Sequence, residues 1–449
     1  MLELNFNFDE IKLHLQKINT MKKIYFSIIT LIVSSATIAN AQCAGERYFN
    51  YVYPSNPIVT SNVNYGSNVK VGGSTQQLML DVYEPNGDTA ALRPLVLVAH
   101  GGSFISGSKT GPDVVPICKD LAKLGYVAAS VEYRLGMTNF PLPGPDSSDA
   151  TEAVMRAVHD GRAAVRYFRK NADVGGNTFK IDTNNIFFAG VSAGGFIALQ
   201  MAYLDEVSEI PTYIDMVGQP GLTGGLEGNS GNPGYSSEVK AIINMCGALG
   251  DTAWMKAGDE PVINFHGTND GTVPYGSDVI TLVGLYPLLE VDGSFSINNK
   301  AVQLGIPSCF EIYEGQDHVP ATSNASYYDT TIVKIRTFLN HFVCGSPLNC
   351  NYNGSIVNAA GAGVHEIGNL QNWTIFPNPS NHKITLNLSS LNANKLNISV
   401  FNYLGQEVIS MNGIVQKQQE IDIQNLSNGV YFVQVNDGVN IYAKKLIKE

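Results

Sequence analysis

The sequence predicts an α/β protein, with a mostly parallel sheet flanked by helices and a small, all-β, sandwich-like C-terminal domain. Two observations favour this class. From about residue 75 to 343, short apolar runs alternate with helical patterns, which is typical of a parallel sheet. After residue 370, polar and apolar residues alternate between Asn-Pro and Asn-Gly turns. At 449 residues, 44% hydrophobic and 15% charged, the chain is long enough for more than one domain.

The largely apolar runs are expected to be strands covered on both faces. In chain order they are Leu78–Tyr83, Leu95–Ala99, Tyr126–Tyr133, Ile186–Ala189, Val239–Met245, Val262–Phe265 and Phe310–Tyr313. The clearest helix spans Thr151–Asn171, with Asp149 or Thr151 as the expected N-cap. Its apolar residues lie on one face, and its charged residues lie mostly on the other: Arg156, Asp160, Arg166 and Arg169.

A glycine-rich segment, residues 205–238, interrupts the alternation of strands and helices. It is either a surface loop or an insertion that shapes a substrate pocket. We favour the pocket, because the segment follows the helix that begins at a candidate nucleophile.

The N-terminal region resembles a secretory signal peptide from Met21. Two lysines precede an apolar stretch, and Ala39-Asn40-Ala41 forms an A-x-A cleavage site. The stretch is short for a membrane anchor. We therefore expect a mis-annotated extension at 1–20, a signal peptide at 21–41, the main α/β domain at 42–345, a linker at 346–370 and the β domain at 371–449.

Charge and cysteine content limit the partners. The formal charge of −11 argues against nucleic acid and anionic membrane surfaces as partners.

Six cysteines in an exported chain permit disulfides, but fifteen pairings are possible. Cys344 and Cys350 are close enough for a small loop, Cys43 can tie the N-terminus to that region, and free thiols are an equal alternative for Cys118, Cys246 and Cys309. No ligand constellation appears, so neither metal nor cofactor is expected.

A nucleophile motif lies between a predicted strand and a predicted helix. The sequence Gly190-Val191-Ser192-Ala193-Gly194 is G-x-S-x-G, in which a strained turn projects the serine hydroxyl off the sheet edge. The following helix, Ala193–Tyr203, directs its positive end at the same point.

A serine nucleophile needs a base, and the base needs an orienting acid. Asp270 and His318 each follow a predicted strand, in the order Ser, acid, His. Asp317 is a rival acid, but a sequence neighbour rarely reaches the histidine ring. His266 is expected to bond the backbone instead.

The stretch His100-Gly101-Gly102-Ser103-Phe104 follows the strand Leu95–Ala99. We predict that backbone N–H groups of Gly101, Gly102 and Ala193 form an oxyanion hole for chemistry at Ser192. The rival interpretation is a Ser103/His100 dyad, which lacks both a nucleophile turn and an orienting acid.

Residues 75 to 343 resemble the α/β-hydrolase carboxylesterase superfamily, most closely the bifunctional feruloyl/acetyl-xylan esterases. The matching segments include "HGGSFISGSK", "GVSAGG", "HGTNDGTVPY" and "GQDH". The resemblance implies Ser192, Asp270 and His318 as catalytic residues and Gly101, Gly102 and Ala193 as oxyanion donors. It also implies hydrolysis of acyl esters through an acyl-enzyme, with acetyl or feruloyl esters of plant polysaccharides as expected substrates.

The last 80 residues resemble the C-terminal sorting domain of the type IX secretion system of Bacteroidetes, through "FPNPS", "FNYLGQEV" and "LSNGVYFVQV". This implies a secreted or outer-membrane surface protein that passes through the periplasm, meets the type IX machinery, and keeps no integral membrane segment after signal cleavage. A carbohydrate-binding β-sandwich is the alternative for this module. For the whole chain, the alternatives are a peptidase of the prolyl-oligopeptidase type and a non-catalytic adhesion protein.

Overall fold

The computed structural model describes residues 43, 46–282, 284–354, 373–388, 396–402, 407–414, 416–436 and 441–449. The chain divides into two compact units, on either side of residue 361. The predicted extension (1–20), the predicted signal peptide (21–41) and most of the predicted linker lie outside the described residues.

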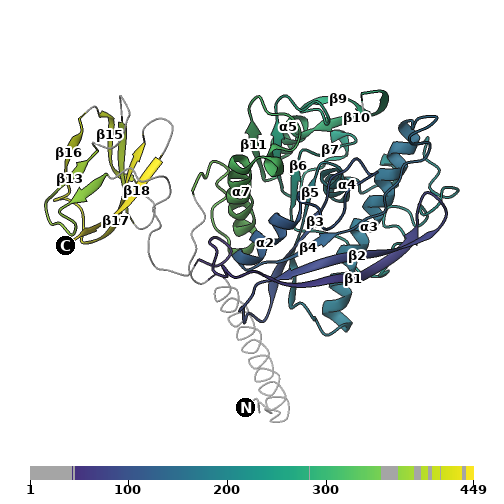
Figure 1. The fold of residues 1–449 in the computed structure, drawn as a ribbon, viewed down its shortest axis with the longest axis horizontal. Coiled ribbons are helices and arrows are strands. Elements are labelled where there is room, and N and C mark those ends of the chain that lie inside the picture. Colours follow the sequence, from purple (N-terminus) through teal and green to yellow (C-terminus); the bar gives the residue numbers. More distant parts are fainter. Residues whose placement is uncertain are drawn as a thin grey trace, which may run out of the picture. The chain divides into compact units, whose positions relative to one another are not determined.

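The first unit is built on an eight-stranded sheet in the order β1-β2-β4-β3-β5-β6-β8-β11 (Figure 1). The two outer contacts, β1 with β2 and β2 with β4, are antiparallel, and the other five are parallel. The strands are β1 (Ile58–Val69), β2 (Thr75–Glu84), β3 (Arg93–Ala99), β4 (Val127–Val131), β5 (Ile181–Val191), β6 (Ile242–Met245), β8 (Val262–Gly267) and β11 (Ser308–Tyr313). The predicted α/β class is confirmed.

Helices cover both faces of the sheet, which explains the continuous apolar runs. In β3, Leu95 and Leu97 belong to one hydrophobic core and Val96 and Val98 to the other. The first core contains α3 (Ser147–Val174), α4 (Ala193–Tyr203) and α5 (Ser294–Leu304). The second contains α2 (Val115–Leu124) and α7 (Ala325–Cys344), while the four-residue α6 (Pro320–Ser323) precedes α7.

Helix α3 begins earlier than predicted. Asp146 is its N-cap and forms a reciprocal capping box with Asp149, so the predicted caps Asp149 and Thr151 are wrong. The error arises because the sequence "DSSDATEA" offers several capping residues within one turn.

The charged face of α3 is buried, because residues 205–238 fold over it. The guanidinium of Arg156 donates to the carbonyl of Pro220 at 2.9 Å, and that of Arg166 donates to the carbonyl of Gly231 at 3.1 Å. Asp160 is fully buried and pairs with Arg134 at 2.9 Å. The segment therefore satisfies buried charges with its backbone carbonyls.

His159 lies on the same buried face and donates from Nε2 to the carbonyl of Gly225 at 2.8 Å. Burial, reinforced by the charge of Arg134, lowers the pKa of His159 to about 3. In the unfolded chain the imidazole takes up its proton near pH 6.5. Between these two values the unfolded chain binds the extra proton, so this stabilisation is complete above pH 6.5 and is lost as pH falls toward 3.

We therefore expect His159→Gln, which keeps a donor but does not titrate, to flatten the acid side of the stability curve. From pH 7 to pH 5, the wild type should lose about 2 kcal/mol of unfolding free energy relative to the variant, measured by urea denaturation. The variant is needed as the reference because burial also raises the pKa of Glu260 to about 7. Protonation of Glu260 stabilises the folded chain as the pH falls, which is opposite to the effect of His159, and it is the same in both proteins. If the unfolding free energies of the wild type and the variant change with pH in parallel, His159 is not the residue responsible.

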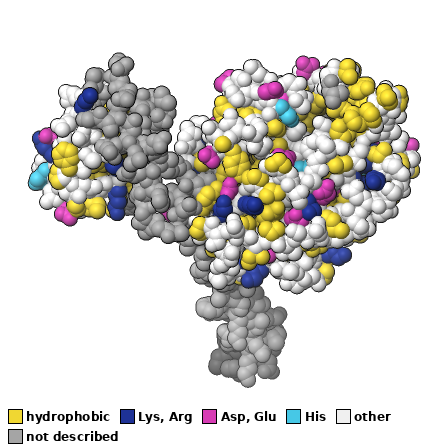
Figure 2. Space-filling view, in the orientation of Figure 1, with side chains coloured by type: hydrophobic (Ala, Val, Ile, Leu, Met, Phe, Trp, Pro, Cys, Tyr) yellow, Lys and Arg dark blue, Asp and Glu magenta, His cyan; other side chains and the backbone are white. Residues whose placement is uncertain are grey.

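Two β elements were not predicted. β1 forms the outer edge of the main sheet, beyond the strand that was expected near the edge. A second sheet, β7-β10-β9, consists of β7 (Ala248–Leu249), β10 (Tyr286–Gly293) and β9 (Ser277–Leu282). Figure 2 shows hydrophobic side chains grouped at the end of the unit where the β9–β10 hairpin lies, and Leu285 is 71% exposed there.

Two disulfides link the ends of the first unit: Cys43–Cys344 and Cys309–Cys350. The tie from Cys43 to the end of α7 agrees with the expectation. The suggested Cys344–Cys350 loop and a free Cys309 are wrong, because Cys350 reaches back to β11. Cys118 and Cys246 are free and buried.

The second unit is all β, as predicted, with two antiparallel sheets, β12-β13-β16 and β15-β14-β17-β18. Its strands are β12 (Thr374–Phe376), β13 (Lys383–Asn387), β14 (Leu396–Asn402), β15 (Glu407–Ile414), β16 (Gln418–Asp422), β17 (Gly429–Asn436) and β18 (Ile441–Lys448). Trp373 is only 2% exposed and belongs to the hydrophobic core of this unit, so it offers no platform for a sugar. In the described parts of the chain, no helix is both long and apolar enough to span a bilayer.

Candidate active site

Ser192 occupies a strained turn between β5 and α4. Its backbone has φ 52° and ψ −115°, outside the regions that L residues ordinarily adopt. The flanking glycines are required sterically. A Cβ on Gly190 would lie 1.9 Å from the carbonyl oxygen of Gly194, and a Cβ on Gly194 would lie 2.1 Å from that of Ala99. The turn thus holds the hydroxyl at the carboxyl end of the sheet.

The structure brings Ser192, His318 and Asp270 together. Nε2 of His318 lies 2.9 Å from Oγ of Ser192, and Nδ1 lies 2.7 Å from Oδ2 of Asp270. Ser192 is 8% exposed, the His318 side chain is 19% exposed, and the Asp270 side chain is fully buried. The distances match a hydroxyl, a general base and an acid that orients the base.

Both oxygens of the Asp270 carboxylate have hydrogen-bond partners. Oδ1 accepts the N–H groups of Thr272 and Val273, both at 2.9 Å, while Oδ2 faces His318 and, at 3.2 Å, Nε2 of His266. Burial by itself raises the pKa of Asp270, but hydrogen bonds from His266 and His318 outweigh it and hold this pKa well below its usual range. The group therefore remains an anion.

The rival acid, Asp317, is directed elsewhere. It is exposed, and its carboxylate accepts the backbone N–H groups of Gly271 at 3.0 Å and His318 at 2.8 Å. It does not bond to the imidazole of His318 in the structure.

The loop after β3 differs from the prediction at one donor. The N–H of Gly101 donates to the carboxylate of Asp113 at 2.8 Å and is therefore not available to a substrate. The N–H groups of Gly102, Ser103 and Ala193 have no acceptor among the described residues. Ser103, with φ 53°, also lines the cavity at Ser192. Sequence reasoning assigned Gly101 because a motif cannot reveal which N–H a distant carboxylate occupies.

His100 stabilises this loop rather than acting on Ser103. Its ring is fully buried, stacks on Tyr133 at a centroid distance of 4.3 Å, and places Nδ1 2.7 Å from the carbonyl oxygen of Gly101. A dyad of Ser103 and His100 therefore does not form in the structure.

A largely apolar cavity of about 300 Å³ opens at Ser192. Its walls come from the loops after β3 and β4, from α3 and α4, and from the β9–β10 hairpin. They include Phe104, Met137, Val154, Phe196, Ile280, Leu282, Leu288 and Leu289. The pocket role that the sequence suggested for residues 205–238 is wrong for this cavity, because none of those residues lines it. Pro211 and Tyr213 instead line a neighbouring cavity of about 90 Å³.

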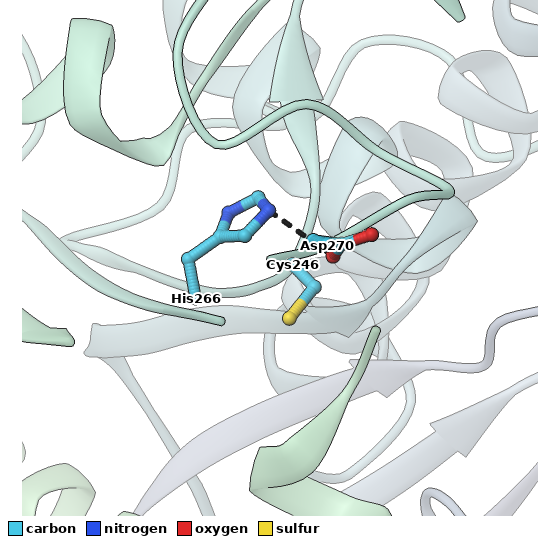
Figure 3. A group of neighbouring side chains, drawn as sticks. All are labelled: Cys246, His266 and Asp270. Atoms are coloured by element: carbon cyan, nitrogen blue, oxygen red, sulfur yellow. Dashed lines mark ion pairs between the residues drawn. The ribbon is translucent and has the colours of Figure 1, made fainter. Parts of the chain in front are cut away.

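Two groups of side chains in the described residues are close enough to share a metal ion. One is Cys246, His266 and Asp270 (Figure 3), and the other is Asp205, Glu206 and Glu209. In the first, burial raises the pKa of the Cys246 thiol to about 12, which keeps it protonated. In the second, Nζ of Lys256 lies 2.7 to 3.2 Å from all three carboxylates, and its positive charge takes the place that a cation would have among them.

Comparison with known families agrees with this organisation. Residues 80–258 match the family model BD-FAE, and residues 374–449 match the secretion system C-terminal sorting domain. The chain therefore carries a BD-FAE domain and a sorting domain. The BD-FAE match includes the loop after β3 and the turn at Ser192, whereas Asp270 and His318 lie beyond it.

Curated relatives of this chain include carboxylesterases. Carboxylesterase 3B of Mus musculus is 33% identical over 153 residues, which cover 33% of this chain and 24% of that protein. Carboxylesterase 3 of Homo sapiens is 34% identical over 123 residues, covering 27% and 19%. The chain thus spans about a quarter or less of these relatives. Among solved structures, esterase 2 of Thermogutta terrifontis covers 66% of this chain and 98% of its own, with 21% identity and a TM-score of 0.47.

Proposed function

We propose that this chain is an exported serine carboxylesterase that hydrolyses acyl esters through an acyl-enzyme. The observation that carries the proposal is the continuous hydrogen-bonded series Ser192–His318–Asp270 at the mouth of an apolar cavity. The BD-FAE domain and the carboxylesterase relatives support the ester chemistry. The sorting domain supports export and a secreted or cell-surface location.

In the proposed mechanism, Oγ of Ser192 attacks the ester carbonyl while Nε2 of His318 accepts its proton. His318 then gives that proton to the departing alkoxide, which leaves the acyl group on Ser192. Water attacks the acyl-enzyme by the same route and releases the acid. Asp270 keeps Nδ1 protonated and stabilises the imidazolium throughout.

The negative charge of each tetrahedral intermediate needs preorganised donors. We assign this role to the N–H groups of Ala193, Gly102 and Ser103. Ala193 begins α4, so its N–H carries the positive end of the helix dipole. Asp113 contributes indirectly, because its bond to Gly101 holds the loop in position.

The test is covalent labelling combined with turnover. The full-length protein should hydrolyse p-nitrophenyl butyrate, and a fluorophosphonate probe should modify Ser192 in the mass spectrum of its peptide. Turnover of aminopeptide substrates without ester turnover would favour a peptidase. Absence of both labelling and turnover would favour the non-catalytic alternative.

The cavity also supports a preference among acyl groups. Its volume of about 300 Å³ is at the lower end of small-molecule sites, and an acetyl group would leave most of it empty. We propose butyryl to octanoyl and aromatic acyl groups such as feruloyl as better substrates than acetyl, because they bury more apolar surface.

Leu288→Trp is expected to fill this cavity from the β9–β10 hairpin, where Leu288 is buried. It should reduce kcat/KM for octanoyl and feruloyl esters about tenfold or more, an overpacking effect of 1–3 kcal/mol, and change acetyl ester turnover much less. Leu285→Trp, on the exposed turn of the same hairpin, is the matched control. An equal loss on all esters would contradict the assignment of the cavity to the acyl group.

A further inference from the structure

A row of fully buried polar side chains extends from Asp270. His266 is the second-last residue of β8, Ser294 begins α5, and Asn244 lies in β6. Nδ1 of His266 is 2.7 Å from Oγ of Ser294, which is 3.1 Å from Nδ2 of Asn244. Figure 3 shows the ring of His266 directed at Asp270.

The partners of each atom determine the direction of these hydrogen bonds. Nε2 of His266 faces Oδ2 of Asp270 at 3.2 Å and the carbonyl oxygen of Val273 at 3.1 Å. Both groups only accept, so Nε2 must carry a proton. Oδ1 of Asn244 accepts the N–H of Gly247 at 2.8 Å, which directs its amide N–H₂ toward Ser294.

The hydroxyl of Ser294 accepts from Asn244 and therefore has its own proton to donate to Nδ1 of His266. The result is one continuous series of donors, from Asn244 through Ser294 and His266 to Asp270. It defines a neutral His266 in the Nε2–H tautomer. The sequence could not show this, because His266 looks like an ordinary residue of a tight turn.

We propose that His266 is a positioning residue for the reaction assigned to Ser192, with its tautomer set by Ser294 and Asn244. Its N–H and the backbone N–H groups of Thr272 and Val273 hold the Asp270 carboxylate from three sides. With the carboxylate held in this orientation, Oδ2 is directed toward Nδ1 of His318. This inference rests on the proposed esterase function.

Hydrogen bonds account for the atoms of this cluster without a metal ion. Nε2 of His266 donates to the carbonyl oxygen of Val273, and burial keeps the thiol of Cys246 protonated. The titratable groups around Asp270 are Cys246, His266, Asp317 and His318. Asp317 is exposed, and the two histidine rings are the titratable groups whose ring nitrogens face the Asp270 carboxylate.

The test compares His266→Phe with His266→Gln, whose amide nitrogen can replace Nε2. His266→Phe should lower kcat for p-nitrophenyl butyrate about 10- to 100-fold, the cost of losing a hydrogen bond to a charged group. KM should stay within about twofold, and the acid limb of the pH–rate profile should move, because Asp270 then interacts more strongly with His318 alone. His266→Gln should restore most of kcat. His341→Phe, whose ring bonds only the carbonyl of Ser346 at the end of α7, is the control.

A measurement on the wild type keeps the proposal testable if the variants fail to fold. In full-length protein labelled with ¹⁵N-histidine, NMR should identify, besides His159, a histidine with a proton on Nε2 only whose signals shift in Ser294→Ala. A proton on Nδ1 of His266, or an unchanged kcat and pH profile in folded His266→Phe, would overturn the positioning role. Neither result would touch the esterase assignment, which fails only if the wild type hydrolyses no ester.

Discussion

Replacing Ser192 with alanine is expected to reduce kcat for p-nitrophenyl butyrate by about 10⁴- to 10⁶-fold. The reason is that Ser192 supplies the only hydroxyl within hydrogen-bond distance of Nε2 of His318 among the described residues. Without it no acyl-enzyme forms, and only the oxyanion donors and substrate binding remain. Steady-state kinetics and loss of fluorophosphonate labelling measure the effect.

Ser208→Ala is the matched control, because Ser208 is exposed on a short 3₁₀ helix and contacts only Glu206 among side chains. Its activity should equal that of the wild type. A Ser192→Ala protein that retains both turnover and labelling would move the nucleophile elsewhere.

Asp270→Asn is expected to lower kcat by about 10⁴-fold with little change in fold. Oδ1 must still accept the N–H groups of Thr272 and Val273, so the amide oxygen takes that position. The amide nitrogen then faces Nδ1 of His318 and the Nε2–H of His266. His318 is forced into the tautomer with its proton on Nε2, which cannot accept the proton of Ser192.

Asp317→Asn distinguishes the two acids. Its carboxylate accepts only backbone N–H groups at the surface, and an amide oxygen can do the same. Activity within about threefold of the wild type is expected, because an exposed hydrogen bond contributes little to the free energy. A large loss in Asp317→Asn and a small one in Asp270→Asn would reverse the assignment.

The sequence predicted the site correctly where neighbouring residues alone determine the geometry. The turn at Ser192 needs glycine at positions 190 and 194 because backbone atoms lie within 2.2 Å of any added Cβ, so the motif reports the structure directly. Asp270 and His318 could be predicted because parallel strands end at the same edge of the sheet. Their meeting with Ser192 follows from strand order.

Long-range contacts were not predictable in the same way. The charged face of α3 looks like a solvated surface, yet it is buried because carbonyls from residues 205–238 happen to reach its arginines. The N–H of Gly101 is occupied by the carboxylate of Asp113, twelve residues farther along the chain, and no local motif indicates this contact. The β9–β10 hairpin lacks a strong turn signal, so the wall of the cavity was also missed.

The two disulfides have a mechanical consequence for a protein held by its C-terminal end. Cys350 is the last cysteine before the sorting domain, and it is bonded to Cys309 in β11, a strand of the central sheet. A pulling force applied beyond residue 350 therefore reaches the sheet through a covalent link. It does not peel α7 away first. Cys43–Cys344 ties the last residue of that helix to the N-terminal segment, so two covalent links secure the C-terminal end of the first unit against such a force.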